Sequence, residues 1–177
     1  LPAIRKKELM AAGQILGIGN IYFMDQQDNH YTLDPDTVLS QIWDTSWVKQ
    51  RLKKLIVNGN YKFIFCLLPQ PSTHGHHKGA TILALQTVNS LPEKSRPVIL
   101  GVTIGEKTDT VETKFNVLDK YPVTSVRSGA SEFRTDRTKS FGFKSALNYK
   151  VIVNLEIAEH KSQGSMQTGM NRGDYEN

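Results

Sequence analysis

The order in which apolar residues recur along the chain limits its fold more than any other feature of the sequence. Residues 2–16 and 48–59 repeat apolar side chains at helical spacing. Residues 63–68 form an unbroken apolar run, which is typical of a strand buried on both faces. Helical spacing returns at 78–91, and 97–103 again has the pattern of a strand. This alternation favours parallel βαβ units, whose right-handed crossovers stack into a three-layer α/β sandwich.

A shorter apolar stretch, residues 21–24, adds a third expected strand. We expect it to lie beside 63–68 and 98–103 in a mostly parallel, Rossmann-like sheet. The polar residues 25–36 then form a loop at the carboxyl end of a strand, where open α/β sheets keep their ligands. Asp44 and the two hydroxyl residues after it offer an N-cap for the next helix.

The sequence suggests a single domain over residues 1–163, which ends in a helix over 145–160. The polar residues 164–177 read as a C-terminal tail. A chain of 177 residues is long enough for one domain with a sizeable core. No stretch approaches the ~18 consecutive apolar residues of a transmembrane helix. We therefore predict no membrane span in this segment.

The net charge of +5 does not by itself predict a partner. Two short basic clusters, Arg5–Lys7 and Arg51–Lys54, each fall on a predicted helix, where a solvated face explains them. A nucleic-acid interface would gather such charge on one face with aromatic platforms, so we expect no nucleic-acid partner. The single cysteine, Cys66, excludes an internal disulfide and a cysteine-based zinc cage, and we expect it to be a small buried hydrophobe.

The densest group of chemically reactive side chains is Thr-His-Gly-His-His-Lys-Gly at residues 73–79, directly after the strand-like run and at the start of a helix. Neutral imidazole is the commonest metal ligand, and a helix N-terminus favours an anionic intermediate. A solvent-exposed His-rich turn is the alternative interpretation. The H-x-x-H spacing predicts that His74 and His77 face one cavity and that His76 points elsewhere.

A catalytic zinc site normally has three protein ligands and a water, and three nearly adjacent histidines cannot supply it alone. Further ligands would have to come from other segments. The candidates in this chain, none of which forms a metal-type spacing with another, are Asp25, Asp28, His30, Asp34, Asp36 and His160.

Four stretches of the chain, in order, resemble one known family. They are the helix at residues 4–18, with its Arg-x-x-Glu and Leu-Gly; the strand and loop at 21–28, which end in Asp28; the His-Gly-His-His at 74–77; and the His-Lys-Ser-Gln at 160–163. Each is weak alone, but together they span nearly the whole chain. They are similar to motifs of the PIG-L/LmbE family, which are zinc-dependent deacetylases of N-acetylglucosamine-type sugars.

The resemblance implies a role for each matched residue and a Zn²⁺ cofactor. His77 matches a zinc ligand, and His74 matches the histidine that stabilises the oxyanion or acts as an acid. Arg5 and Asp28 match positions that bind the sugar. His76 stands where many members have an acid.

The family's two other zinc ligands and its catalytic base lie in an Ala-His-Pro-Asp-Asp-Glu motif after the first strand of its Rossmann-like sandwich. Nothing here matches that motif, which would lie upstream of Leu1. We therefore expect the isolated chain to be a weak or inactive enzyme.

The resemblance thus implies a metal-dependent hydrolase whose small-molecule partner is an N-acetylated amino sugar or glycoconjugate. A catalytically incomplete, sugar-binding remnant of the same fold is the alternative. A serine esterase is disfavoured because the chain has no Gly-x-Ser-x-Gly elbow.

Overall fold

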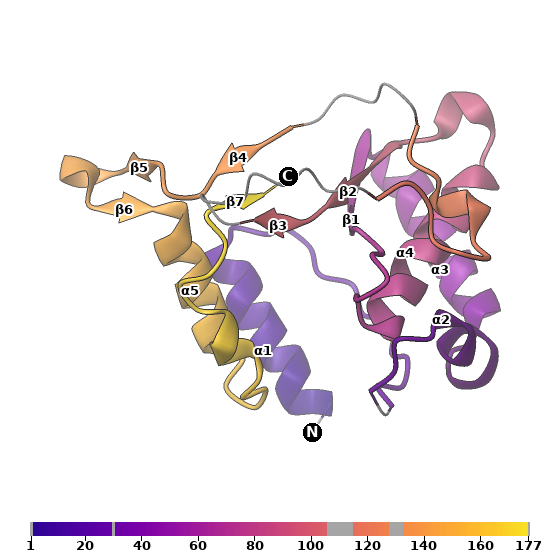
Figure 1. Ribbon diagram of the computed structural model, residues 1–177, viewed down its shortest axis with the longest axis horizontal. Helices are drawn as coiled ribbons and strands as arrows, with labels where there is room; N and C mark the ends of the chain where they lie inside the picture. The colour runs from indigo at the N-terminus through magenta and orange to yellow at the C-terminus, as the bar shows by residue number, and fades with distance from the viewer. Residues whose placement is uncertain (1, 30, 106–114, 128–132, 177) are drawn as a thin grey trace. The chain divides into compact units, whose positions relative to one another are not determined.

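The computed structural model describes residues 2–29, 31–105, 115–127 and 133–176 (Figure 1). Helices and strands are mixed, and one small sheet is parallel, as expected of an α/β chain. The chain divides into two compact units, where the sequence suggested a single domain. Unit 1 comprises residues 1–23, 104–111 and 132–177, and unit 2 comprises residues 24–103 and 112–131.

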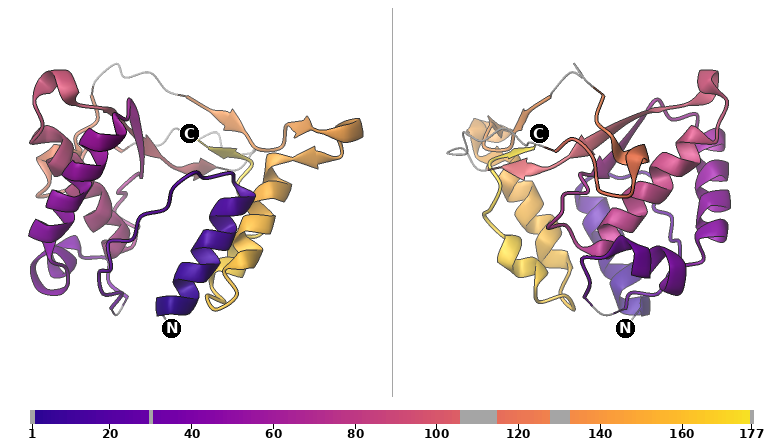
Figure 2. Two further views of the ribbon diagram at one scale, coloured as in Figure 1. Left: turned by 180° about the vertical axis from the view of Figure 1, so that it is seen from behind. Right: turned by 45° about the vertical axis from the view of Figure 1, so that its right-hand side comes forward.

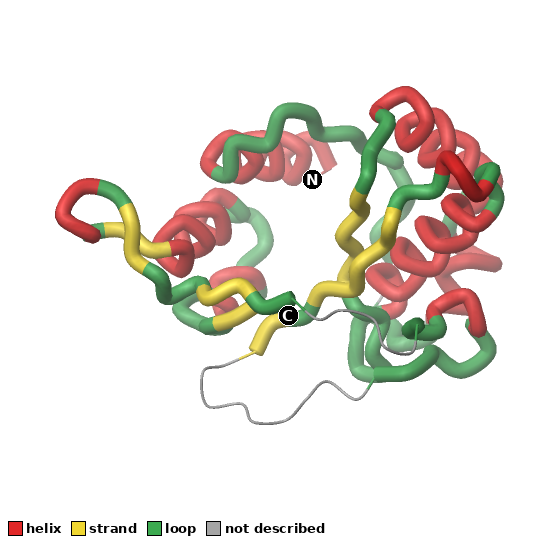
Figure 3. Tube along the Cα trace, turned by 90° about the horizontal axis from the view of Figure 1, so that it is seen from above, coloured by secondary structure: helices red, strands yellow, loops and turns green. Residues whose placement is uncertain are grey.

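Unit 2 contains the parallel sheet and the helices that cover one of its faces. Strands β1 (Phe63–Leu67) and β2 (Val98–Val102) pair in parallel, and α4 (Gly75–Asn89) lies between them in the chain. Together with α3 (Thr45–Gly59), α4 lies on one side of the strands (Figure 3). This is the βαβ unit that the periodicity predicts.

Local signals explain where α3 begins and ends. The Asp44 carboxylate accepts a hydrogen bond from Trp47 N at 2.9 Å, so the predicted N-cap is confirmed. The helix ends at Asn60, whose φ of 47° lies in the left-handed region that asparagine tolerates.

The core of unit 2 lies between the helices and one face of the sheet. Ile56, Val88 and Leu91 are buried there, and Leu52, Ile64 and Ile99 pack against them.

Within unit 2, helices cover one face of this sheet, so the expectation that 63–68 is buried on both faces holds for that face alone. Phe63, Phe65 and Leu67 are exposed, and Phe65 retains 68% of its accessible surface. The reason is that α3 and α4 pack against only the alternate side chains. The apolar run therefore identified a strand but not the number of layers around it.

The expected strand at residues 21–24 is wrong as well. These residues are described, and they form no regular structure. A strand exists only through the hydrogen bonds of a ladder, and no described strand pairs with this segment.

The described residues of unit 2 also form four short helical turns. They are α2 (Pro35–Thr37), the π-helical turn η1 (Val38–Ile42), and the 3-10 turns η2 (Glu93–Ser95) and η3 (Pro122–Thr124).

Unit 1 is built on two helices that pack side by side, α1 (Pro2–Ile15) and α5 (Tyr149–Glu159) (Figure 2). The expected helix over 145–160 starts later, because Asn148 caps it by accepting from Val151 N at 3.0 Å. Before it, β5 (Ser140–Phe141), the turn η4 (Phe143–Ser145) and β6 (Leu147–Asn148) form a hairpin.

The segment expected to be a tail carries regular structure. It contains the 3-10 turn η5 (Met166–Gly169) and strand β7 (Tyr175–Glu176). β7 is the central strand of a small antiparallel sheet, between β3 (Ile104–Gly105) and β4 (Thr135–Asp136). None of the helices among the described residues is long and apolar enough to cross a bilayer.

Candidate functional site

The three histidines lie where β1 passes into α4, at the carboxyl end of the parallel strands. His74 occupies the N-cap position of α4, and Gly75 is the first residue of the helix. Gly75 N donates to Thr32 O at 2.7 Å. A Cβ atom at Gly75 would lie 2.8 Å from Asp34 O, so only glycine lets this loop pack against the helix start.

The imidazole rings form one contiguous group. The His74 and His76 rings stack at 4.7 Å between centroids with 9° between their planes. The His74 and His77 rings meet edge to face at 5.8 Å. His74 and His77 therefore lie together as expected. The expectation that His76 points elsewhere is wrong, because His76 supports the ring of His74.

His76 is the buried member of the group. It retains 7% of its accessible surface, and the Trp43 ring packs edge-on to it at 5.6 Å. Its Nε2 accepts a hydrogen bond from Asn29 N at 3.4 Å, and its Nδ1 has no hydrogen-bond partner among the described residues. Burial lowers the pKa of His76, and the charge of His74 lowers it further, against the opposing effect of Asp28.

His77 is exposed, yet its neighbours still displace water from its ring. Desolvation lowers the pKa of His77, with smaller contributions from His74 and His76, while Asp28 opposes the shift. The imidazole is therefore neutral near pH 7, which is the form that binds a metal or accepts a proton.

Asp28 lies close enough to act electrostatically on both His76 and His77. Its chain neighbours are fixed, because Gln27 O accepts from the Trp43 indole Nε1 at 3.0 Å and Asn29 N donates to His76. The structure thus brings together three of the predicted site residues, His74, His77 and Asp28.

Lys78 is a member of the site region whose role the sequence analysis missed. Its ammonium group is buried and donates to Leu33 O at 2.9 Å and to Pro71 O at 2.6 Å. Burial lowers the pKa of Lys78, and Asp34 opposes that shift. Its spacing from Ile82, one turn along the inward face of the helix, was the available signal.

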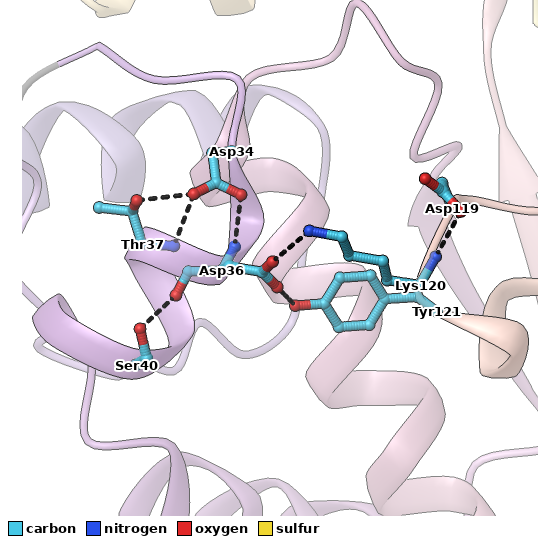
Figure 4. Close-up of polar contacts among 7 residues, drawn as sticks. All are labelled: Asp34, Asp36, Thr37, Ser40, Asp119, Lys120 and Tyr121. Atoms are coloured by element: carbon cyan, nitrogen blue, oxygen red, sulfur yellow. Dashed lines mark hydrogen bonds and ion pairs between the residues drawn. The ribbon is translucent and has the colours of Figure 1, made fainter.

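Two of the candidate ligand carboxylates, Asp34 and Asp36, serve local structure instead (Figure 4). Asp34 caps α2 through the backbone N–H of Asp36 and both the N–H and the hydroxyl of Thr37, and these bonds lower its pKa. Asp36 accepts from the Tyr121 hydroxyl and pairs with Lys120 at 3.4 Å. Burial and the bond to Asp36 raise the pKa of Tyr121 well above its usual range.

His160, the candidate from the fourth motif, lies in unit 1 at the end of α5, with both ring nitrogens in hydrogen bonds. Nε2 contacts Glu156 Oε1 at 3.1 Å, and Nδ1 contacts Gln163 Nε2 at 3.2 Å. Two residues on, Ser162 donates its N–H and its hydroxyl to the buried carboxylate of Glu8 on α1, at 2.7 and 2.8 Å. The His-Lys-Ser-Gln segment therefore joins α5 to α1.

The remaining candidates lie in different parts of the chain. Arg5 is half-buried on α1 of unit 1, and Asp25 has a φ of 50° in unit 2. His30 lies outside the described residues. Among the residues that the structure describes, no three His, Cys, Asp or Glu side chains are arranged to hold a metal ion. No family model, curated protein or solved structure matches this chain.

Proposed function

We propose that the histidine group at the start of α4 belongs to a metal-dependent hydrolase that removes an acetyl group from an N-acetylated amino sugar. The proposal includes a Rossmann-like sandwich of the PIG-L/LmbE kind. The observation that carries it is the geometry of the H-x-x-H motif. The ring centroids of His74 and His77 lie 5.8 Å apart, at the carboxyl end of a parallel strand, and the charge of Asp28 acts on His77.

The described residues supply only part of the ligand set that the zinc of this activity requires. His77 fits as one ligand, because its ring is exposed and neutral near pH 7. The two further ligands of a catalytic site are not found around it among the described residues.

His74 is suited to stabilise a developing oxyanion. Its ring stacks on His76, which is itself fixed against Trp43, so the donor is held in one orientation before substrate arrives. The N-terminus of α4 adds partial positive charge at the same place.

Asp28, beside the histidines in unit 2, is the proposed sugar-binding residue of this site, and Arg5 of unit 1 is the other position that the resemblance assigns to sugar binding. A carboxylate accepts hydrogen bonds from sugar hydroxyls, and a guanidinium donates to hydroxyl or phosphate oxygens. In this scheme, substitution of Arg5 raises KM more than it lowers kcat, because a contact remote from the reacting carbonyl holds substrate and transition state alike.

A sugar-binding protein without catalysis is the second candidate, and the exposed ring of Tyr31 favours it. Tyr31 retains 77% of its accessible surface and lies 4.9 Å from the His74 ring. An exposed aromatic face beside polar side chains suits the C–H face of a sugar ring.

Zinc content and acetate release separate the two candidates. We expect the full-length gene product to bind one equivalent of zinc and to release acetate from an N-acetylated amino sugar, in a reaction that a chelator stops. Saturable sugar binding that survives chelation and His77→Ala, without acetate release, would instead establish the binding protein.

A further inference from the structure

The hairpin of β5 and β6 presents an aromatic side chain to solvent at its tip. Phe143 retains 82% of its accessible surface, the highest value among the exposed large hydrophobic side chains described. The hairpin extends away from α1 and α5 within unit 1 (Figure 1). A large apolar side chain in this position gains free energy only when something apolar covers it.

The hairpin is ordered by contacts behind its tip. Ser140 pairs with Asn148 and Phe141 with Leu147, and the Phe141 ring packs on that of Tyr149 at 4.7 Å. These contacts fix the two strands from which the tip extends.

The backbone of the tip has three residues in the left-handed region. Gly142 has a φ of 77°, and both Lys144 and Ser145 have a φ of 53°. Left-handed backbone at two successive residues other than glycine is uncommon. The chain keeps this conformation although it buries no part of the tip.

The side chains of the hairpin itself carry charge of one sign, while Asp136 and Asp174 lie near its base, where they bind Thr138 and Lys150. Residues 137–155 contain no Asp or Glu. Lys139 and Lys144 are exposed, and neither forms an ion pair with a carboxylate among the residues that the structure describes. Lys144 Nζ lies 5.3 Å from the Phe143 ring centre, so a cation accompanies the apolar group.

We propose that this hairpin docks unit 1 onto an anionic lipid surface, with Phe143 inserted at the headgroup level and Lys139 and Lys144 against lipid phosphates. An apolar tip with Lys144 beside it and Lys139 at the base of the hairpin matches a bilayer interface, where long cationic side chains reach the headgroups while apolar groups insert. A single-stranded nucleic acid would need a groove with successive stacking rings, whereas this tip is convex and carries one exposed ring. The proposal is independent of the proposed enzymatic function.

Co-sedimentation with lipid vesicles tests the proposal on the 177-residue chain. We expect the chain to pellet with vesicles of phosphatidylcholine and phosphatidylserine at 70:30 and to remain in solution with phosphatidylcholine alone. Added salt should weaken the binding, because counterions screen the lysines. Failure to pellet with the anionic vesicles would overturn the proposal.

A matched pair of charge variants distinguishes a specific contribution of the hairpin to vesicle binding from an effect of net charge. Lys139→Gln/Lys144→Gln and Lys53→Gln/Lys54→Gln, the second pair on α3, change the net charge equally. Each lysine of the hairpin is attracted to the anionic surface, so we expect the loss of both to lower the partition coefficient about 30-fold. The α3 pair should change the partition coefficient much less. Equal losses would mean that any basic surface suffices, and the hairpin proposal would be wrong.

A matched pair of phenylalanine variants tests insertion. Phe143→Ser should lower the partition coefficient about tenfold, whereas Phe133→Ser, which removes a ring that is 66% exposed outside the hairpin, should not. Brominated lipids should quench the fluorescence of Phe143→Trp more than that of Phe133→Trp. Equal quenching, or hairpin-dependent binding to an oligothymidine strand without vesicle binding, would overturn the proposal.

Discussion

Gly75→Ala tests whether the loop of residues 32–34 packs against the start of α4 as closely as the structure has it. The added methyl group would lie 2.8 Å from Asp34 O and 3.0 Å from Thr32 O, both of which are backbone atoms. Relief requires the loop to move away from the helix. That movement would weaken the hydrogen bond from Gly75 N to Thr32 O and disturb the carbonyl of Leu33 that holds Lys78.

The expected change is a loss of stability of about 2 kcal/mol. Overpacking costs ~1–3 kcal/mol, and the weakened hydrogen bond costs about 1 kcal/mol. Alanine returns up to ~1 kcal/mol as the better helix former. The sign of the change in unfolding free energy is informative, because without the close contact Gly75→Ala would stabilise α4.

The assay is urea denaturation followed by tryptophan fluorescence. Both tryptophans of the chain, Trp43 and Trp47, lie in unit 2, so the signal reports on the unit that contains the substitution. Gly79→Ala, in the same helix and the same unit, is the matched control, because the nearest atoms to its added methyl group are side-chain atoms at 3.4 Å. An unchanged or raised unfolding free energy for Gly75→Ala would refute the described packing of the loop.

Three further predictions concern the site and its support. In the full-length protein, His74→Ala should lower kcat by roughly 10²–10³ with zinc content unchanged, whereas His77→Ala should lose the metal; the opposite pattern would reverse the two roles. The pKa of His76 is lower in the folded chain than its unfolded value of 6.5, so its contribution to stability is full above pH 6.5 and declines as the pH falls through the folded pKa. The urea midpoint should therefore be lower at about pH 5.5 than at about pH 7.5, and this difference should be smaller in His76→Asn. Tyr121→Phe should cost about 1 kcal/mol, because Asp36 loses its hydroxyl donor, whereas Lys120→Ala should cost almost nothing, because that ion pair is exposed; equal costs by thermal denaturation would contradict the assignment.

Residue patterns predicted the elements of unit 2 where the signal is local. The apolar runs gave β1 and β2, and Asp44 gave the start of α3. The cap at Asp44 depends on residues within three positions of one another, and the apolar runs are equally local, although the pairing of β1 with β2 joins distant segments. The position of the histidines is local as well, because it follows from the end of a strand and the start of a helix.

Features that depend on distant segments could not be predicted in this way. Residues 21–24 have the apolar pattern of a strand, but a strand also needs a partner, and none of the described strands supplies one. The bond between Tyr121 and Asp36 joins residues 85 positions apart, and no periodicity signals it. The end of the chain was expected to be a tail because it is polar, and its pairing in β7 has no local signal because that pairing depends on β3 and β4.

The chemistry of the histidine motif depends on both kinds of information. The spacing of His74 and His77 is local, but the lowered pKa of His77 comes from its surroundings, and Asp28 opposes that shift from a segment almost fifty residues away. That segment is anchored at Asn29 by His76 and, further along, at Thr32 by Gly75. A side chain at Gly75 would displace the loop from the helix. Gly75 therefore keeps the H-x-x-H motif close to Asp28, whose carboxylate acts on the pKa of His77. A larger residue at Gly75 should therefore weaken ligand binding at His77 while leaving the H-x-x-H sequence intact.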